Sequence, residues 1–120
     1  MDLIDKRIFI SAAGAGMGQS VAHLALQAGA KVYATDLDAT GLEALQSLGA
    51  TTEVLGIRNK KLVNDYFSSI PDFDGLVNIA GWVHHGTILD VDETDWRKSL
   101  INNIDSMYYV LRAAIPGLQR

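Results

Sequence analysis

Apolar residues occur along the chain in two alternating patterns, short continuous runs and longer stretches with one apolar position in every three or four. A short run predicts a buried strand, and the wider spacing predicts an amphipathic helix. The predicted strands cover 8–10, 31–35, 51–55 and 75–80. The predicted helices cover 17–28, 42–48 and 62–70, and a longer one runs from Asp92 to its close at Pro116-Gly117. This alternation indicates βαβ units, and therefore an α/β domain with a parallel sheet and right-handed crossovers.

Each predicted helix has a recognisable end and one apolar side. Gly29 and Gly49 follow the first two helices as C-terminal caps, and Asp92 is expected to cap the last helix, with Asp95 three residues further on. The apolar sides consist of Met17, Val21, Leu24, Ala25 and Ala28; Leu42, Leu45 and Leu48; Leu62, Val63, Tyr66, Phe67 and Ile70; and Trp96, Leu100, Ile104, Met107, Leu111 and Ile115. On the last helix, Ile101, Tyr108 and Val110 widen the predicted apolar surface.

The composition is that of one globular domain spanning 1–120, since 48% of the 120 residues are hydrophobic and 20% are charged. The chain has no cysteine, which excludes a disulfide scaffold and a thiolate metal site and favours a reducing compartment. The net charge is −4 and no basic run is longer than a pair such as Lys60-Lys61, which argues against a nucleic-acid partner. Neither a signal peptide nor a membrane span is expected, so the sequence predicts a cytoplasmic protein without membrane contact.

A glycine-rich segment, Ser11 to Gly18, lies between the first predicted strand and the first predicted helix. Small residues there let the backbone pass close to a pyrophosphate, and the helix N-terminus offers unpaired N–H groups. Gly14 and Gly16 fit the common dinucleotide-binding spacing, but Gln19 stands where that pattern has its third glycine. The alternative is that the glycines serve only tight packing between helix and strand.

Asp36 ends the second predicted strand, 18 residues after Gly18. An acidic residue near this offset binds the hydroxyls of an adenine ribose and repels a 2′-phosphate. Leu37 follows where a phosphate-binding arginine would stand, so the sequence favours NAD over NADP. The alternative is an aspartate that merely ends a strand.

Taken together, the glycine segment, Asp36, the run Val77-Asn78-Ile79-Ala80-Gly81 and Asn103 resemble the short-chain dehydrogenase/reductase family. The family's Thr-Gly-x-x-x-Gly-x-Gly motif corresponds to Ser11-Ala12-x-x-x-Gly16-x-Gly18, and its Asn-Asn-Ala-Gly motif to residues 78–81. The resemblance implies a Rossmann-type doubly wound parallel sheet with strand order 3-2-1-4, truncated before the family's remaining strands. It also implies that residues 78–81 line the adenosine ribose. Asn103 matches the catalytic asparagine that holds a water linked to the family's lysine.

Three departures from the family pattern affect what the resemblance implies. Ala12 replaces the first glycine of the motif, and Gly56 stands where many members have an aspartate for the adenine amine, which leaves the backbone of Gly56 and Ile57 for this contact. The family's serine and Tyr-x-x-x-Lys pair are absent, and Tyr108-x-x-x-Arg112 lies on a different helix. The 120 residues alone are therefore predicted to be inactive.

A loop with two adjacent histidines, His84 and His85, follows the fourth predicted strand. The loop resembles that of the branch with cytosolic 3-hydroxybutyrate-type and related keto-acid reductases, which implies contact with an acidic substrate. The alternative is a polar loop without such a role. A metal site is not expected, because the third histidine, His23, is remote and no cysteine is available.

The leading hypothesis is an NAD-dependent oxidoreductase that acts on a ketone/secondary-alcohol pair, with a small hydroxy or keto acid as one option for the substrate. The alternative is a non-catalytic dinucleotide-binding module. A homo-oligomer is expected through the last helix and the fourth strand, because that strand lacks the charges or proline that protect a sheet edge. The predicted cofactor-binding residues are Ser11, Ala12, Gly14, Ala15, Gly16, Met17, Gly18, Asp36, Leu37, Gly56, Ile57, Asn78, Ala80 and Gly81.

Overall fold

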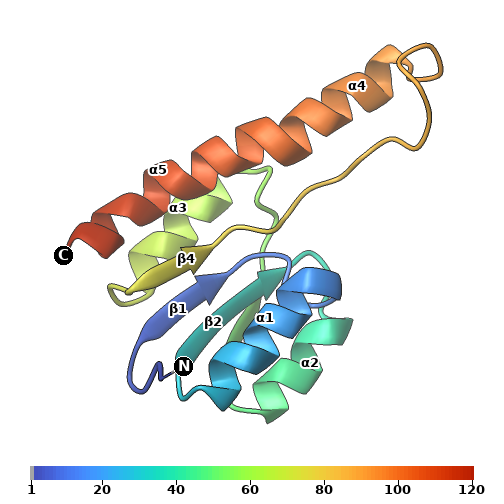
Figure 1. Ribbon diagram of the computed structural model, residues 1–120. Helices are drawn as coiled ribbons and strands as arrows, with labels where there is room; N and C mark the ends of the chain where they lie inside the picture. The colour runs from blue at the N-terminus through green and yellow to red at the C-terminus, as the bar shows by residue number, and fades with distance from the viewer. Residues whose placement is uncertain (1) are drawn as a thin grey trace.

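The computed structural model describes residues 2–120 and contains one four-stranded parallel sheet (Figure 1). The strands are β1 (Arg7–Ile10), β2 (Lys31–Asp36), β3 (Thr51–Val54) and β4 (Gly75–Val77). Their order is β3-β2-β1-β4, and in the register Phe9 of β1 pairs with Tyr33 of β2 and Leu76 of β4. The structure confirms the predicted α/β class and the predicted strand order.

The helices form two layers, one on each face of the sheet. They are α1 (Gly16–Gln27), α2 (Thr40–Ser47), α3 (Lys60–Ser69), α4 (Glu93–Leu100), the π-helical turn η1 (Ile101–Asp105) and α5 (Ser106–Gln119). Helices α1 and α2 cover one face, and α3 and α5 cover the other (Figure 1). Helix α4, η1 and α5 run on as one rod, whose α4 end projects beyond the sheet (Figure 1).

Each face of the sheet has its own core because successive strand residues point to opposite sides. Phe9 and Ile10 are neighbours in β1 and are fully buried in different clusters. The first cluster consists of Ile10, Ala13, Ala22, Ala25, Ala30, Val32, Ala34, Leu42, Leu45 and Ala50. The second consists of Phe9, Leu55, Ile57, Val63, Tyr66, Phe73, Val110 and Ala114. The first cluster is rich in alanine, whereas the second contains three aromatic residues.

The predicted helix ends are confirmed at three places. Gly29 and Gly49 follow α1 and α2 with φ angles of 92° and 104°, a conformation that favours glycine. Asp92 caps α4, since its carboxylate accepts a hydrogen bond of 2.7 Å from the Asp95 N–H.

The predicted apolar side of α1 is wrong in part. Met17 and Leu24 are 75% and 65% exposed, whereas Gly18, Ala22 and Ala25 are buried. The physical reason is the close approach of α1 to the strand layer, which leaves room only for small residues on the inner side. Leu48 and Leu62, which were predicted on the apolar sides of the next two helices, are exposed as well.

The apolar side predicted for the last helix lies mostly at the surface of the structure. Nine residues were predicted to form this surface, and seven of them are exposed: Trp96, Leu100, Ile101, Ile104, Met107, Tyr108 and Ile115. Leu111 is half-buried. The buried side consists of Ser106, Val110, Ala114 and Gly117. Val110, which was expected on the open surface, is fully buried against the second cluster.

Pro116-Gly117 does not close the last helix, because α5 continues to Gln119. Gly117 packs on Phe73, where an added Cβ would lie 3.0 Å from the ring. This contact holds the turn beyond the proline against the protein. Strand β4 is likewise shorter than predicted and ends at Val77. The N–H groups of Ile79 and Ala80 donate to the side chain of Ser11, the residue after β1, instead of continuing the ladder of the sheet.

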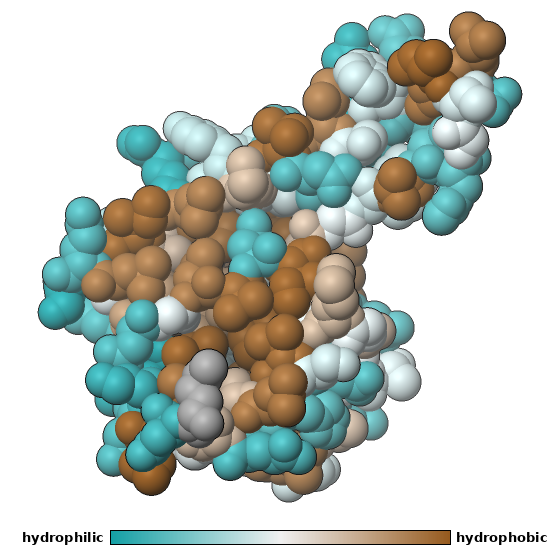
Figure 2. All heavy atoms as spheres, viewed as in Figure 1, coloured by the Kyte–Doolittle hydropathy of each residue, from teal (hydrophilic) through white to brown (hydrophobic). Residues whose placement is uncertain are grey.

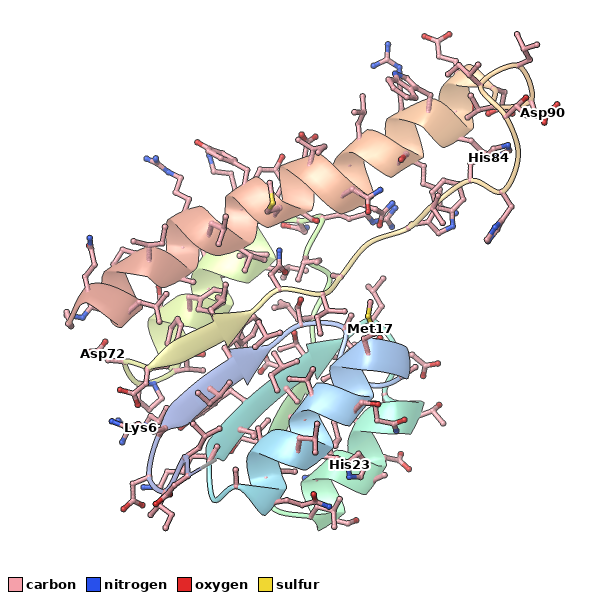
Figure 3. The ribbon with its side chains drawn as sticks, in the orientation of Figure 1. Lys6, Met17, His23, Asp72, His84 and Asp90 are labelled. Carbon is pink, nitrogen blue, oxygen red and sulfur yellow. The ribbon has the colours of Figure 1, made fainter. Side chains whose placement is uncertain are left out.

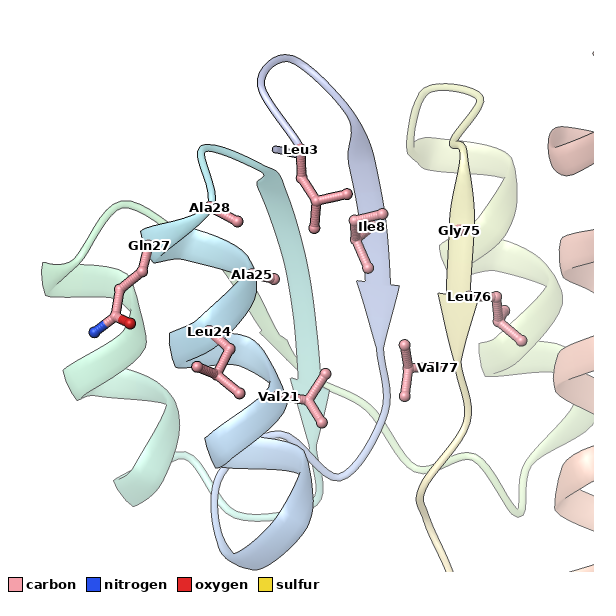
Figure 4. Close-up of a pocket in the computed structure, with 10 residues that line it drawn as sticks. All are labelled: Leu3, Ile8, Val21, Leu24, Ala25, Gln27, Ala28, Gly75, Leu76 and Val77. Carbon is pink, nitrogen blue, oxygen red and sulfur yellow. The ribbon is translucent and has the colours of Figure 1, made fainter. Parts of the chain in front are cut away.

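An apolar groove of about 640 Å³ lies beside β4, which pairs on one side with β1 and forms the edge of the sheet. Figure 4 shows the residues that line it, and Figure 2 shows hydrophobic residues gathered on this face. They are Leu3, Ile8, Val21, Leu24, Ala25, Gln27, Ala28, Gly75, Leu76 and Val77. Within residues 2–120, no helix combines the length and the apolar character needed to cross a bilayer.

Candidate functional site

The glycine segment forms a tight turn at the carboxyl end of β1. Ala12 and Gly16 have φ angles of 50° and 56°, in the left-handed region. A Cβ added to Gly16 would meet no atom within 4 Å, so this part of the turn faces open space. The turn therefore has one glycine whose role is conformational, and one alanine held in a conformation that glycine adopts more easily.

Gly18 and Gly41 let two helices approach this turn. An added Cβ at Gly18 would lie 2.0 Å from the Ala12 carbonyl oxygen, and one at Gly41 would lie 1.8 Å from the Gly14 carbonyl oxygen. Both distances exclude any side chain. Gly18 thus has the packing role that the sequence left open as an alternative, and Gly41 of α2 belongs to the same arrangement. Sequence reasoning missed Gly41 because no motif marks it.

The N-terminus of α1 points its first N–H groups at the turn without a side-chain cap. Ala15 is the N-cap residue and has no side chain able to accept a hydrogen bond. The first-turn N–H groups of Gly16, Met17 and Gly18 are left for an external acceptor, and the helix dipole favours an anion there. An anionic ligand at this end of the sheet would meet these groups.

Asp36 ties the end of β2 to the glycine turn. Its Oδ2 accepts a hydrogen bond of 2.9 Å from the Gly14 N–H, and its Oδ1 accepts one of 3.1 Å from the Asp38 N–H. Each carboxylate oxygen can accept a second hydrogen bond. Asp36 is therefore held in place by backbone donors and still has acceptor capacity for a ligand hydroxyl.

A cavity of about 150 Å³ lies at the carboxyl ends of the strands. Six of its ten lining residues are predicted cofactor-binding residues: Ala12, Asp36, Leu37, Ile57, Ala80 and Gly81. The other four are Thr35, Leu55, Arg58 and Asn102. Thr35 is 1% exposed, and its hydroxyl has no hydrogen-bond partner among residues 2–120. Sequence reasoning missed Thr35 and Arg58, although Thr35 directly precedes the acidic residue that it did identify.

Ser11 and Asn78 lie behind this cavity and hold its wall. Ser11 is fully buried, and its hydroxyl donates to Asn78 Oδ1 at 2.8 Å. The Ser11 Oγ in turn accepts hydrogen bonds from the N–H groups of Ile79 at 2.9 Å and Ala80 at 3.2 Å. These bonds fix the segment after β4, so both residues shape the cavity without lining it.

Gly56 borders a second, more open cavity next to the first. It lines that cavity of about 570 Å³ together with Leu37, Arg58, Asn59, Lys60 and Ile101. Five further predicted residues line neither cavity and form the turn and the start of α1 beside them: Gly14, Ala15, Gly16, Met17 and Gly18. Contact of any of these residues with a cofactor remains a prediction.

Asn103 lies in the π-helical turn η1 and clamps the chain after β4. Its Oδ1 accepts a hydrogen bond of 2.9 Å from the Trp82 N–H, while its Nδ2 donates to the Trp82 carbonyl and, at 2.9 Å, to the Ser99 carbonyl. A side chain bound in this way to both the N–H and the carbonyl of one residue acts as a positioning residue. The predicted catalytic role through a held water stays a prediction.

His84 lies on the projecting end of the molecule, away from the glycine turn that Met17 marks (Figure 3). His84 Nδ1 lies 3.0 Å from Asp95 Oδ2, and its Nε2 is buried without a partner among the described residues. His85 is exposed and His23 lies on α1. In residues 2–120, no three His, Asp or Glu side chains are grouped so as to hold a metal ion.

The parallel sheet in the order 3-2-1-4, the glycine turn after β1 and the acidic residue after β2 define a Rossmann-type α/β domain. The family model described as enoyl-(acyl carrier protein) reductase matches residues 11–120. The chain belongs to the short-chain dehydrogenase/reductase family.

Relatives from several organisms support this membership. The chain is 44% identical to 2-keto-3-deoxy-L-fuconate dehydrogenase of Xanthomonas campestris, over 94% of this chain and 38% of that protein. It is 41% identical to dehydrogenase/reductase SDR family member 6 of Rattus norvegicus, over 94% of this chain and 46% of that protein. A solved short-chain type dehydrogenase/reductase from Mycobacterium ulcerans superimposes with a TM-score of 0.89 at 25% identity, over 98% of this chain and 48% of that one. The chain thus spans about half the length of the relatives that it matches.

Members of this family use NAD(P). The site fits the adenosine diphosphate half of such a cofactor on three grounds. It has uncapped N–H groups at the start of α1, a fixed carboxylate at Asp36, and an unpaired buried hydroxyl at Thr35 beside the cavity.

Proposed function

We propose that the chain is the cofactor-binding part of an NAD-dependent oxidoreductase that acts on a ketone/secondary-alcohol pair. The observation that carries the proposal is the cavity lined by Asp36 and the unpartnered Thr35 at the carboxyl ends of the strands, next to the turn with free N–H groups. Ligands of open α/β sheets bind at this edge. The names of matching relatives favour a small hydroxy or keto acid as the substrate: they are a 2-keto-3-deoxy-L-fuconate dehydrogenase and NADP-dependent 3-hydroxy acid dehydrogenases of Salmonella.

Different residues of the chain would bind different parts of the cofactor. The N–H groups at the start of α1 would take the pyrophosphate, and the second acceptor positions of the Asp36 carboxylate would take the ribose hydroxyls. Bound NAD would supply the hydride acceptor for the alcohol. Asn103 would hold the Trp82 peptide, and with it the loop that follows the cavity wall.

The preference for NAD over NADP rests on the charge of Asp36. A 2′-phosphate placed at its carboxylate would lose a hydrogen bond and meet a like charge in a half-buried site, at a cost of roughly 1–3 kcal/mol. Calorimetric titration should therefore show NAD⁺ binding roughly 5- to 150-fold more tightly than NADP⁺.

A matched pair of variants tests this role of Asp36. Asp36→Asn keeps an acceptor for the Gly14 N–H but removes the charge, and should narrow the difference between the two cofactors. Asp38→Ala removes a neighbouring exposed carboxylate that bonds to Thr40 and does not line the cavity, and should leave the difference unchanged. Equal affinity of the unmodified protein for both cofactors would refute the assignment of NAD.

A non-catalytic dinucleotide-binding module is the second candidate function. It is favoured by the contacts of Asn103, whose side chain is occupied by Trp82 and Ser99. Since the 120 residues alone are predicted to be inactive, the assay is oxidation of NADH in the presence of a keto acid when the family's serine and Tyr-x-x-x-Lys pair are supplied together with this chain. Turnover under these conditions would favour the oxidoreductase over such a module. Within the leading proposal, the partners are a small-molecule substrate and a second copy of the chain, and a cytoplasmic location agrees with the lack of cysteine.

A further inference from the structure

Arg58 occupies a position between the two cavities at the carboxyl edge of the sheet. It follows Ile57, which is buried, and it lines both the 150 Å³ cavity with Asp36 and the neighbouring cavity with Gly56. The side chain is exposed, so it belongs to the rim and not to the floor of the smaller cavity.

The guanidinium of Arg58 has no other task in the described part of the chain. Neither an ion pair nor a hydrogen bond joins it to another side chain of residues 2–120. It is also the single cation among the residues that line the smaller cavity. A long charged side chain without a partner at the rim of this cavity is available for a ligand.

The walls next to Arg58 suit a flat apolar group. Leu55 and Ile57 are buried cavity residues from the segment that follows β3, and Leu37 follows Asp36 at the end of β2. If Asp36 holds the ribose, the attached base lies within reach of these walls and of Arg58. A planar guanidinium stacks on such a ring through cation–π attraction, which a lysine ammonium reproduces less well.

We infer that Arg58 is a cofactor-binding residue that closes the adenine pocket by stacking its guanidinium on the base. This inference rests on the proposed function, because it takes the smaller cavity as the adenosine site. It makes Arg58 a determinant of affinity for the adenine half of the cofactor, separate from the role of Asp36 at the ribose.

Titrations with ADP-ribose and with adenosine test the inference without any need for turnover. ADP-ribose is measured by calorimetry and adenosine, which has no phosphate, by ligand-observed NMR. Arg58→Ala should weaken both ligands about three- to tenfold. Arg58→Lys keeps the charge without the planar group and should weaken both at least about twofold.

Lys60→Ala is the matched control, since Lys60 lines the neighbouring cavity but not the smaller one. It should leave both affinities unchanged, and far-UV circular dichroism should show all three variants folded. If Arg58→Ala loses affinity for ADP-ribose but not for adenosine, the side chain acts by simple charge attraction and the inference is overturned. The same conclusion follows if Arg58→Lys binds both ligands as the wild type does. Wild-type affinity in Arg58→Ala would overturn it and leave the proposed function standing. Failure of the unmodified protein to bind ADP-ribose would overturn both.

Discussion

Gly81 lies where a methyl group would break the contact between Asn103 and the Trp82 peptide. A Cβ built on Gly81 would lie 2.5 Å from Asn103 Oδ1, well inside van der Waals contact. The φ angle of Gly81 is not in the left-handed region, so the effect of Gly81→Ala is purely steric. The amide of Asn103 would have to move away from the Trp82 N–H, which it now meets at 2.9 Å.

The expected loss follows from the hydrogen bonds involved. Asn103 makes two bonds to Trp82, and each neutral bond contributes about 1 kcal/mol to stability. Gly81→Ala should therefore lower the free energy of unfolding by roughly 2 kcal/mol, with a drop in Tm of roughly 6–10 °C for a domain of this size. Urea unfolding followed by tryptophan fluorescence measures the change, and Trp82 itself reports on the site.

Gly56→Ala is the matched control, because its added Cβ would meet Leu37 Cδ2 at an ordinary 3.7 Å. It should change stability by less than about 0.5 kcal/mol, as most substitutions at partly exposed positions do. A double mutant with Asn103→Ala should lose little beyond the larger single effect, since both changes remove the same contact. Gly81→Ala as stable as the wild type, or fully additive losses in the double mutant, would refute the role of Asn103 as a clamp.

Two further outcomes are expected. Ala12→Gly should raise the free energy of unfolding by about 0.5–1 kcal/mol, because Ala12 has a φ of 50° that glycine adopts without strain. The control Ala13→Gly, in the buried core, should lower it. Urea unfolding measures both changes, and a destabilising Ala12→Gly would contradict this reasoning. Light scattering should show the purified chain as an assembly, because the exposed face of α4, η1 and α5 is apolar. Ile104→Asp on that face should weaken the assembly. A stable monomer of 13.0 kDa at tens of micromolar would contradict this prediction.

The sequence alone determined the kind and order of the elements. Strands and helices alternate with different apolar periods, and this local signal needs no knowledge of partners. The ends of α1, α2 and α4 at Gly29, Gly49 and Asp92 were equally local, since each depends on one residue and the backbone next to it. The candidate site was predictable to the extent that it follows from strand ends, which is why Asp36 and the glycine turn lie at the same edge of the sheet.

Tertiary packing decided which side of each helix is buried. Helix α1 has apolar residues on more than one side, and only its distance from the sheet selects Gly18 and Ala22 over Met17 and Leu24. The residues of the predicted stripe on the last helix lie outside because α5 presents Val110 to the aromatic cluster. A periodic pattern gives the number of apolar residues on a helix but not the direction from which the rest of the protein approaches.

Contacts between residues distant in the sequence also depended on the fold. Ser11 bonds to Asn78 and to the backbone beyond it, and Asn103 holds Trp82, over separations of 67 and 21 residues. Gly41 approaches the glycine turn, and Arg58 reaches the rim of the cavity, only because parallel strands bring their carboxyl ends together. The type of each side chain determines which contacts it can make, but the register of the sheet and the path of the helices determine which residue it contacts.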